Sequence, residues 1–309
     1  MSLFERLLGR KKPSAHVAWE PTRQLDHVSA EEVSADGRHR RSDVPYLLPK
    51  DEQEDHRLGY QHFLLRQVLA GHCFAPVHNL LRRGGKVLDV GCGTGIWGRD
   101  IARAYPQTHV IGFDLEEVPS PTPAPRNVHV VQGNLLKGLP FAAQSFDYVH
   151  QRLLVAAIPL KNWPWVVEEL KRVTAAEGWM ELVEMGTAFH RVGPATRQFL
   201  QWWSAISASR GIDASYMSQL GLLLTRAGLY NIRTETKMVP VGTWGGRIGN
   251  LLAQDMLAGW PSMRPLAHAL LGVAPEAFDE VMSQLEMEWN TYQTSYELYF
   301  ACGQVAEKR

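Results

Sequence analysis

The stretch that decides the fold is Val87-Leu88-Asp89-Val90-Gly91-Cys92-Gly93-Thr94-Gly95, an apolar run that ends in three alternating glycines. Helical spacing begins at Ile96, so the pattern predicts a strand, a tight glycine turn and a helix whose first N–H groups can face a ligand. A dinucleotide-binding loop would have its third glycine where Ile96 stands, and a P-loop would need a Lys-Ser/Thr pair that this stretch lacks. The loop therefore indicates a ligand site of another kind.

Strands and helices alternate around this loop. Strands are predicted at residues 86–90, 109–113, 128–132, 146–150 and 179–183, and helices at 52–81, 96–104 and 163–173. Such alternation is typical of a parallel, doubly wound α/β sheet with helices on both faces.

The C-terminal part of the chain follows a different pattern. Two helices are predicted across 195–227, a strand at 230–239, helices at 247–258 and 275–290, and a last strand at 295–302. A helical stretch between two strands predicts an antiparallel sheet edge with a helical cap inserted in it.

The overall charge is balanced, because 32 Lys and Arg residues match 32 Asp and Glu residues. A protein that binds duplex nucleic acid concentrates positive charge against the phosphates, so we expect no nucleic acid as the main partner. The ten Trp, ten Phe and nine Tyr residues supply a core, an interface or an apolar ligand pocket, and composition does not separate these uses.

Cysteine usage and hydropathy predict the environment of the chain. Cys73, Cys92 and Cys302 are far apart and show no CxxC spacing, so we expect neither a disulfide framework nor a metal site. This cysteine usage predicts a reducing, cytoplasmic setting. Apolar runs are shorter than the roughly 20 residues of a membrane-spanning helix, so no integral membrane association is expected. Residues 1–12 form a short basic amphipathic segment, read as a packing helix or a membrane-surface contact.

Two carboxylates indicate the ligand. Asp89, two residues before the loop, would repel a pyrophosphate but attract a ligand with an ammonium group. Asp114 ends the second strand, where an acid accepts hydrogen bonds from both hydroxyls of a ribose. A molecule with a ribose, a cationic or zwitterionic group and no diphosphate fits both, and S-adenosylmethionine meets these conditions.

These features resemble the ordered motifs of class I S-adenosylmethionine-dependent methyltransferases: Asp89-x-Gly91-x-Gly93-x-Gly95, Asp114, the turn Gly133-Asn134, and Ser145-Phe146-Asp147. The resemblance covers residues 83–185 and implies a Rossmann-like, seven-stranded sheet, here with a helical cap insertion and an N-terminal extension. It also implies that the loop holds the methionine portion, Asp114 the ribose and the turn the adenine. The family usually has Asp where this chain has Asn134, whose amide oxygen can still accept from the adenine amino group.

A narrower resemblance is to the branch that contains fungal LaeA-like methyltransferases and bacterial relatives in natural-product pathways. It is carried by Tyr148-Val149-His150-Gln151-Arg152-Leu153-Leu154, Asn162-Trp163-Pro164 and Gly178-Trp179-Met180-Glu181-Leu182-Val183-Glu184. Upstream, Tyr46-x-x-Pro49, Asp55-His56-Arg57-Leu58 and Gln61-His62 resemble the segment that closes over the cofactor in that branch.

Four segments are expected from these patterns. They are a loosely ordered extension over 1–50, a helical cofactor-covering segment over 51–82, a cofactor-binding core over 83–190, and the remaining strands over 191–309 with the cap at about 245–290.

Candidate catalytic groups stand at the ends of two strands. His150 is interpreted either as a base or substrate contact or as a hydrogen-bonded structural histidine, and Glu184 is a second candidate base. Gln151 at the same rim could border the cofactor, and Arg152 could pair with an acid, face solvent or contact the substrate.

The residues expected to bind the cofactor are Tyr46, His62, Asp89, Gly91, Cys92, Gly93, Thr94, Gly95, Asp114, Leu115, Asn134, Leu135 and Gln151. The substrate candidates are Arg152, Trp203, Trp244 and Arg247. The aromatic residues of the cap could line a substrate cavity or form the core of the cap, and Arg247 could meet an anionic substrate, face solvent or pair with Asp255.

The sequence thus predicts a methyltransferase that produces S-adenosylhomocysteine and acts on a small, largely apolar organic acceptor in secondary metabolism. Two alternatives stay open: a regulatory cofactor-binding protein that acts through protein partners, and a cofactor-dependent cyclase on the same fold. Nothing in the sequence decides whether the chain forms a homo-oligomer.

Overall fold

The computed structural model describes residues 31–33, 37–41, 44–118 and 125–307. The amphipathic segment predicted over residues 1–12 lies outside these ranges. No helix in the described part of the chain is both long enough and apolar enough to cross a membrane.

The centre of the fold is a seven-stranded sheet with the strand order β5-β4-β3-β6-β7-β9-β8. Its strands are β3 (Lys86–Val90), β4 (His109–Asp114), β5 (Val128–Gln132), β6 (Phe146–Arg152), β7 (Thr174–His190), β8 (Leu229–Pro240) and β9 (Ser295–Val305). Strands β3 to β7 are parallel, and β9 runs antiparallel to both β7 and β8. The predicted doubly wound α/β sheet with an antiparallel edge is confirmed.

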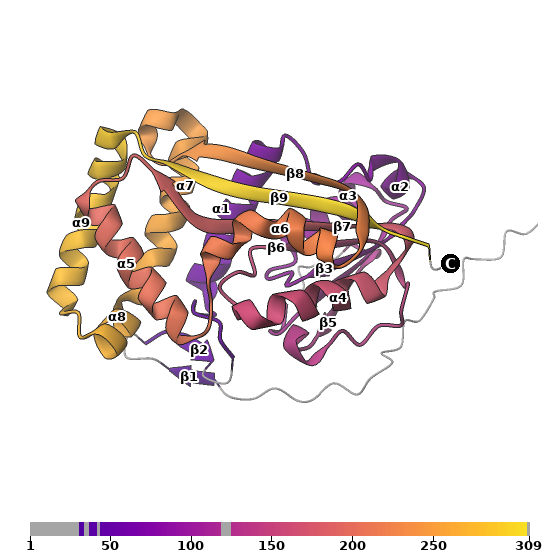
Figure 1. Ribbon diagram of the computed structural model, residues 1–309, viewed down its shortest axis with the longest axis horizontal. Helices are drawn as coiled ribbons and strands as arrows, with labels where there is room; N and C mark the ends of the chain where they lie inside the picture. The colour runs from indigo at the N-terminus through magenta and orange to yellow at the C-terminus, as the bar shows by residue number, and fades with distance from the viewer. Residues whose placement is uncertain (1–30, 34–36, 42–43, 119–124, 308–309) are drawn as a thin grey trace, which may run out of the picture.

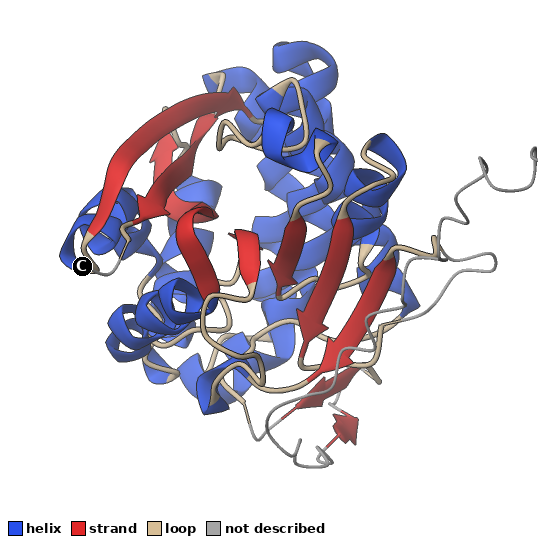
Figure 2. Ribbon diagram, turned by 90° about the vertical axis from the view of Figure 1, so that its right-hand side faces the viewer, coloured by secondary structure: helices blue, strands red, loops and turns tan. Residues whose placement is uncertain are grey.

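Helices cover both faces of the sheet (Figure 2). On one face, Val87 of β3 packs with α2 (His78–Arg82) and α3 (Ile96–Ala104). On the other, Leu88 and Val90 pack with α4 (Trp163–Val173), the 3₁₀ helix η4 (Ala214–Gln219) and α6 (Leu220–Arg226). The alternation follows from the two-residue period of a strand, so β3 is buried on both sides.

The remaining large helices gather at one end of the molecule, at the left in Figure 1. They are α5 (Pro194–Ser209), α7 (Gly246–Gly259), α8 (Arg264–Leu271) and α9 (Pro275–Tyr292), and α1 (Glu52–Leu69) packs against α7. Residues 241–294 leave the sheet after Pro240 and return at Ser295, and these two residues pair in the ladder of β8 and β9. The N–H of Val241 donates to the carbonyl of Thr294 at 2.9 Å, which closes the base of the insertion.

The structure departs from the predicted extension over 1–50. A small hairpin of β1 (Glu31–Val33) and β2 (His39–Arg41) precedes a segment in which Val44 and Leu47 are buried. Residues 44–50 have no periodicity because they are irregular backbone, but their apolar side chains are part of the folded body. The helix α8 was not predicted either, because its eight residues give too few turns for a clear pattern.

Candidate functional site

A cavity of about 300 Å³ opens at the carboxyl ends of β3, β4, β5 and β6. Two groups of residues line it. The loop part is lined by Tyr46, Gly91, Cys92, Gly93, Thr94, Asp114, Leu115, Asn134, Leu135 and Arg152, and the cap part by Met185, Phe189, Phe199, Trp203, Met256, Trp260 and Tyr296. The cavity therefore joins the predicted ligand loop to the aromatic cap.

The glycine loop has the geometry that its sequence predicts. Gly91, Gly93 and Gly95 have φ of +67°, +54° and +69°, a region that other residues adopt with strain. A Cβ placed on Gly91 would lie 2.4 Å from Cδ2 of Leu154, so glycine is needed there for space as well. The turn leads directly into α3, and the N–H groups of Gly91 and Cys92 tie it to the end of β4 by donating to the carbonyl of Phe113.

Asp114 is held by the backbone at the next strand end. Its carboxylate accepts from the N–H of Gly93 at 2.7 Å and from the N–H of Glu116 at 3.0 Å. Burial raises the pKa of Asp114 to about 6, against these two hydrogen bonds, which lower it. Each carboxylate oxygen accepts one backbone hydrogen bond and retains capacity for another, so a vicinal diol in the cavity has acceptors available.

The turn after β5 brings Asn134 and Leu135 to the same wall. The side chain of Asn134 caps the 3₁₀ helix η2 (Leu135–Lys137) by accepting from the N–H of Leu136 at 2.9 Å. Its amide NH₂ group has no hydrogen-bond partner assigned within the described residues. The oxygen keeps one lone pair, so this side chain can offer both a donor and an acceptor to a base.

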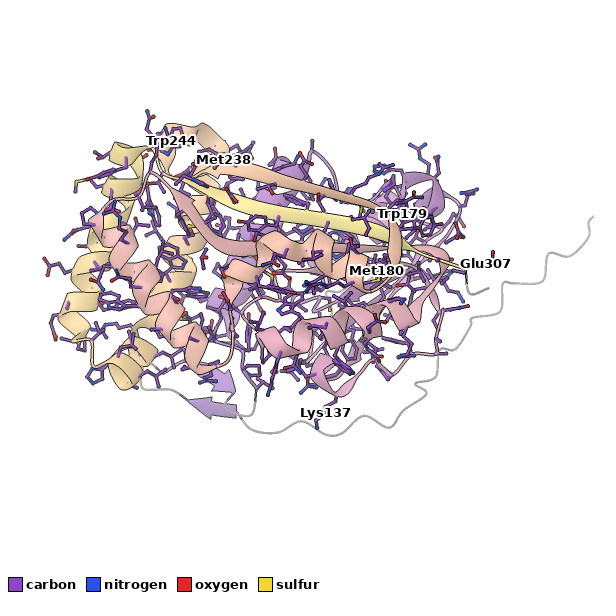
Figure 3. All side chains as sticks on the ribbon, in the orientation of Figure 1. Lys137, Trp179, Met180, Met238, Trp244 and Glu307 are labelled. Carbon is purple, nitrogen blue, oxygen red and sulfur yellow. The ribbon has the colours of Figure 1, made fainter. Side chains whose placement is uncertain are left out.

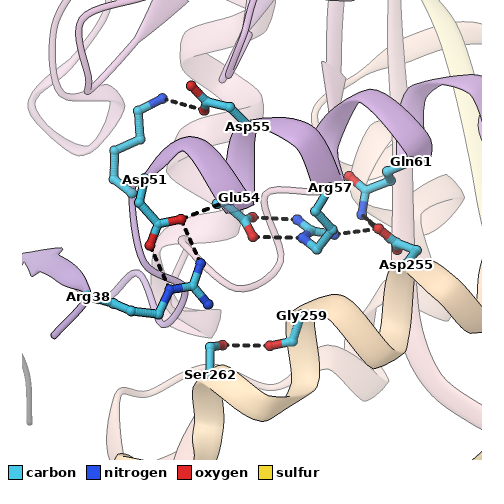
Figure 4. Close-up of polar contacts among 10 residues, drawn as sticks. Arg38, Asp51, Glu54, Asp55, Arg57, Gln61, Asp255, Gly259 and Ser262 are labelled. Carbon is cyan, nitrogen blue, oxygen red and sulfur yellow. Dashed lines mark hydrogen bonds and ion pairs between the residues drawn. The ribbon is translucent and has the colours of Figure 1, made fainter. Parts of the chain in front are cut away.

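A buried ionic cluster connects α1 to the cap (Figure 4). Arg57 donates two hydrogen bonds to Glu54, at 2.6 and 2.8 Å, and a third to Asp255 of α7 at 2.6 Å. Gln61 donates to Asp255 at 3.1 Å. All four side chains line the cavity, where two carboxylates share one guanidinium. Burial raises the pKa of Asp255 and Glu54, although Arg57 opposes both shifts.

A second polar chain reaches the wall through Arg152. The Nη2 of Arg152 donates to Nδ1 of His62 at 3.1 Å, and Nε2 of His62 lies 3.0 Å from the carboxylate of Asp100 on α3. A guanidinium only donates, so Nδ1 of His62 is an acceptor and its proton sits on Nε2, facing Asp100. Burial, together with the nearby Arg152, lowers the pKa of His62 to about 4.

The candidate base His150 is not on the wall of the cavity. It is 1% exposed, its Nδ1 donates to Asp89 at 2.9 Å, and its ring stacks on Trp97 with centroids 3.8 Å apart. Register explains the difference: His150 pairs with Asp89 across β6 and β3, and both side chains point toward the face covered by α3. The structure thus places His150 behind the cavity wall, hydrogen-bonded to Asp89 and stacked on Trp97.

Glu184 and Gln151 are enclosed as well. The Nε2 of Gln151 donates to Glu184, which also accepts from the N–H groups of Leu154 at 2.9 Å and Val155 at 3.1 Å. Burial raises the pKa of Glu184 to about 8. These bonds fix the backbone of the segment that packs on Gly91, and Glu184 does not line the cavity.

Two predicted substrate residues lie away from the cavity. Trp244 is at the outer edge of the molecule beside Met238 (Figure 3), and its indole N–H donates to the carbonyl of Val241 at 2.9 Å. Arg247 stacks on Phe63 at 4.9 Å instead of pairing with Asp255. The predicted cofactor residues that are not on the wall are His62, Asp89, Gly95 and Gln151. Trp203 and Arg152 do lie on it.

The sequence interpretation missed Glu54 and the pairing of Arg57 with Asp255, and it treated Trp260 only as one of the aromatic residues of the cap. Arg57 and Asp255 are 198 residues apart, so no local spacing could relate them. Trp260 stacks on Phe199 with ring centroids 3.9 Å apart, and the two rings form one wall of the cap part. Within the described residues, no group of three His, Cys, Asp or Glu side chains could hold a metal ion.

Comparison with known proteins gives a family match and several relatives. A family model described as a methyltransferase domain matches residues 60–234. Methyltransferase str2 of Strobilurus tenacellus is 34% identical over 44% of this chain and 48% of its own length. N-methyltransferase verN of Clonostachys rogersoniana is 27% identical over 81% of this chain and 89% of its own. The secondary metabolism regulator LAE1 of Cochliobolus heterostrophus is 27% identical over 64% of this chain and 67% of its own. The match to str2 thus spans about half of that relative.

Proposed function

Because the chain belongs to the methyltransferase domain family whose model matches residues 60–234, we propose that it transfers the methyl group of S-adenosylmethionine to a small, largely apolar organic acceptor in secondary metabolism. The observation that carries this proposal is one continuous cavity, in which the glycine loop and Asp114 share walls with the aromatic residues of the cap. The loop part suits the cofactor and the cap part suits the acceptor.

The residues of the loop part fit this cofactor. Asp114 offers carboxylate oxygens to ribose hydroxyls, and the bare backbone of Gly91 and Gly93 allows close approach of the amino-acid portion. Asn134 offers an amide to the adenine. When bound, the cofactor supplies an electrophilic methyl group on a sulfonium, and the protein has to align an acceptor with it and exclude water.

The cap part supports an apolar acceptor that needs no strong base. Its wall is aromatic and aliphatic, including Trp203, Phe199 and Trp260. The carboxylates Glu54 and Asp255 are both bound to Arg57, while His150 and Glu184 lie behind the wall. A neutral amine or a preformed enolate would react in such a site by alignment alone, and the similarity to verN, an N-methyltransferase, agrees with the first of these.

Two measurements test the proposal. Isothermal titration should show that the protein binds S-adenosylhomocysteine, and that Asp114→Ala weakens this binding by roughly 10-fold or more, since a hydrogen bond to a charged group contributes ~1.5–3 kcal/mol. Incubation with S-adenosylmethionine and extracts of natural-product-forming fungi should yield S-adenosylhomocysteine and a product heavier by one CH₂.

The substitution Trp203→Ala should lower turnover without changing cofactor affinity, because Trp203 lines only the cap part. Product without the added CH₂ would favour the cyclase alternative. Cofactor binding without turnover, combined with a stable protein partner, would favour the regulatory alternative, which the similarity to the secondary metabolism regulator LAE1 suggests. Absence of cofactor binding would reject the proposed function.

A further inference from the structure

The strand order arranges the polar groups of the loop part in a row. Asn134 follows β5, Asp114 ends β4, the glycine loop follows β3, and Arg152 ends β6, and these four strands are consecutive neighbours in the sheet. Neighbouring strands are about 4.8 Å apart, so each group lies one step further along the carboxyl edge. A ligand with its base at Asn134 and its ribose at Asp114 has its opposite end at the glycine loop and Arg152.

Arg152, at the end of this row, has N–H donors that are not used in hydrogen bonds to the described residues. Among the described residues, its one assigned hydrogen bond is to His62, although a guanidinium carries five N–H donors. None of its nitrogens is both buried and without a partner, so the nitrogens without a hydrogen bond keep some accessible surface, and Arg152 lines the cavity. Asp89, Glu181 and Asp100 act on this guanidinium electrostatically, but among the described residues none of them forms an ion pair with it, so its remaining donors are available to an anionic ligand.

The position of Arg152 decides which anion it meets. His62 and Asp100 hold it beside α3, the helix that begins at the glycine loop, and not beside the cap helices α5 and α7. Leu154, two residues further, packs directly on Gly91. The guanidinium therefore belongs to the loop part of the cavity, next to the segment that would hold the amino-acid end of the cofactor.

We propose that Arg152 binds the α-carboxylate of the cofactor's amino-acid end and that the chain Asp100–His62 positions it, an inference that rests on the proposed function. His62 fits the role of a positioning residue because its Nδ1 lone pair fixes one Nη of Arg152 and adds no charge. Asp100 in turn fixes the tautomer of His62, and it also accepts from Arg66 at 2.8 Å. Arg152 is thus assigned to the cofactor, where the sequence suggested the acceptor.

Three ligands distinguish the binding contribution of the carboxylate from that of the rest of the cofactor. They are S-adenosylhomocysteine, its carboxamide, and 5′-methylthioadenosine, which lacks the amino-acid end. Isothermal titration of the unaltered protein should give tighter binding of S-adenosylhomocysteine than of the carboxamide by roughly 10- to 100-fold. This comparison needs no substitution, so it holds even where a variant folds poorly.

Three variants test which residue causes the preference for S-adenosylhomocysteine over its carboxamide. Arg152→Gln should bring the two affinities within about 3-fold of each other and leave 5′-methylthioadenosine binding unchanged, because a charge-assisted hydrogen bond has been removed. His62→Leu should reduce the preference in part, which a purely structural histidine would not do. Arg66→Gln is the matched control: it removes another arginine bound to Asp100, off the cavity wall, and should keep the full preference.

The outcomes are distinct. A full preference in Arg152→Gln, or no preference in the unaltered protein that still binds S-adenosylhomocysteine, would overturn the carboxylate site and leave the proposed function standing. Failure of the unaltered protein to bind any of the three ligands would overturn the proposed function, and the carboxylate site with it.

Discussion

Arg57 of α1 donates to Asp255 of α7 at 2.6 Å, and this buried ion pair links the helix α1, which lines the cavity, to the cap. Both side chains are almost fully buried, at 6% and 4% exposure, and Glu54 completes the cluster. Removing one partner of a buried ion pair leaves an unpaired charge, which is more destabilising than the pair is stabilising.

Arg57→Met should lower the free energy of unfolding by ~3–5 kcal/mol, because it leaves two buried carboxylates without their guanidinium. Urea denaturation of the unaltered protein and the variant measures this difference in the free energy of unfolding. Arg264→Met is the control, since Arg264 and Asp279 form an exposed pair at 2.9 Å whose loss should stay below about 1 kcal/mol. Equal effects of the two substitutions would show that the buried cluster does not hold the cap.

Gly91→Ala should destabilise the protein more than the φ angle alone explains. The added methyl group would meet Leu154 at 2.4 Å, whereas Gly272 has the same φ of +67° and no atom within 4 Å of an added Cβ. Gly272→Ala should cost ~1–2 kcal/mol for the left-handed backbone, and Gly91→Ala should add ~1–3 kcal/mol of overpacking. Unfolding of the double variant with Leu154→Ala separates the two effects, and a double variant no more stable than Gly91→Ala would argue against the clash.

The pKa of Asp114, raised from 3.8 to about 6, predicts opposite pH dependences for folding and for cofactor binding. The carboxyl group of Asp114 stays protonated up to about pH 6 in the folded chain but only up to about pH 3.8 in the unfolded chain. The stability that this protonated carboxyl group contributes is therefore fully present below pH 3.8 and is lost as the pH rises through 6. The ribose needs the ionised carboxylate, so affinity for S-adenosylhomocysteine should fall up to about 10-fold per pH unit below 6. In Asp114→Asn the dependence of stability and of S-adenosylhomocysteine affinity on pH should lose the part that comes from this carboxyl group. If the pH dependence of the affinity stayed the same, another residue would be responsible for it.

His150→Asn should lower stability without affecting the cofactor. The stacking on Trp97 is lost and Asp89 loses its buried donor, for a cost of ~1–3 kcal/mol. Because His150 lies behind the wall, the Kd of S-adenosylhomocysteine should stay within about 3-fold of that of the unaltered protein. A much larger change in Kd, at a temperature where the variant is folded, would show that His150 takes part in cofactor binding.

The fold was predictable because its signals are local. Apolar runs bounded by glycines marked β3, and the apolar spacing after Gly95 marked α3, with boundaries that match the structure. Part of the cavity wall was predictable as well: the glycine loop and Asp114 lie on it, and so do Arg152 and Trp203. The sequence left two interpretations of His150 open because a strand end alone does not say which face a side chain takes, and the register with Asp89 decides that. The cluster of Arg57 and Asp255 joins residues far apart in the sequence, which only the packed structure brings together.

The pairing of Pro240 with Ser295 at the base of the cap has a consequence for how this protein can change. Residues 241–294 enter and leave the sheet at one point, so an insertion or deletion within them shifts no strand register. Doubling the length of such a loop adds only about 0.6 kcal/mol of closure entropy. The part of the cavity wall that residues 241–294 supply, such as Met256 and Trp260, is therefore free to diversify in size and chemistry while the strands that carry the glycine loop and Asp114 stay as they are.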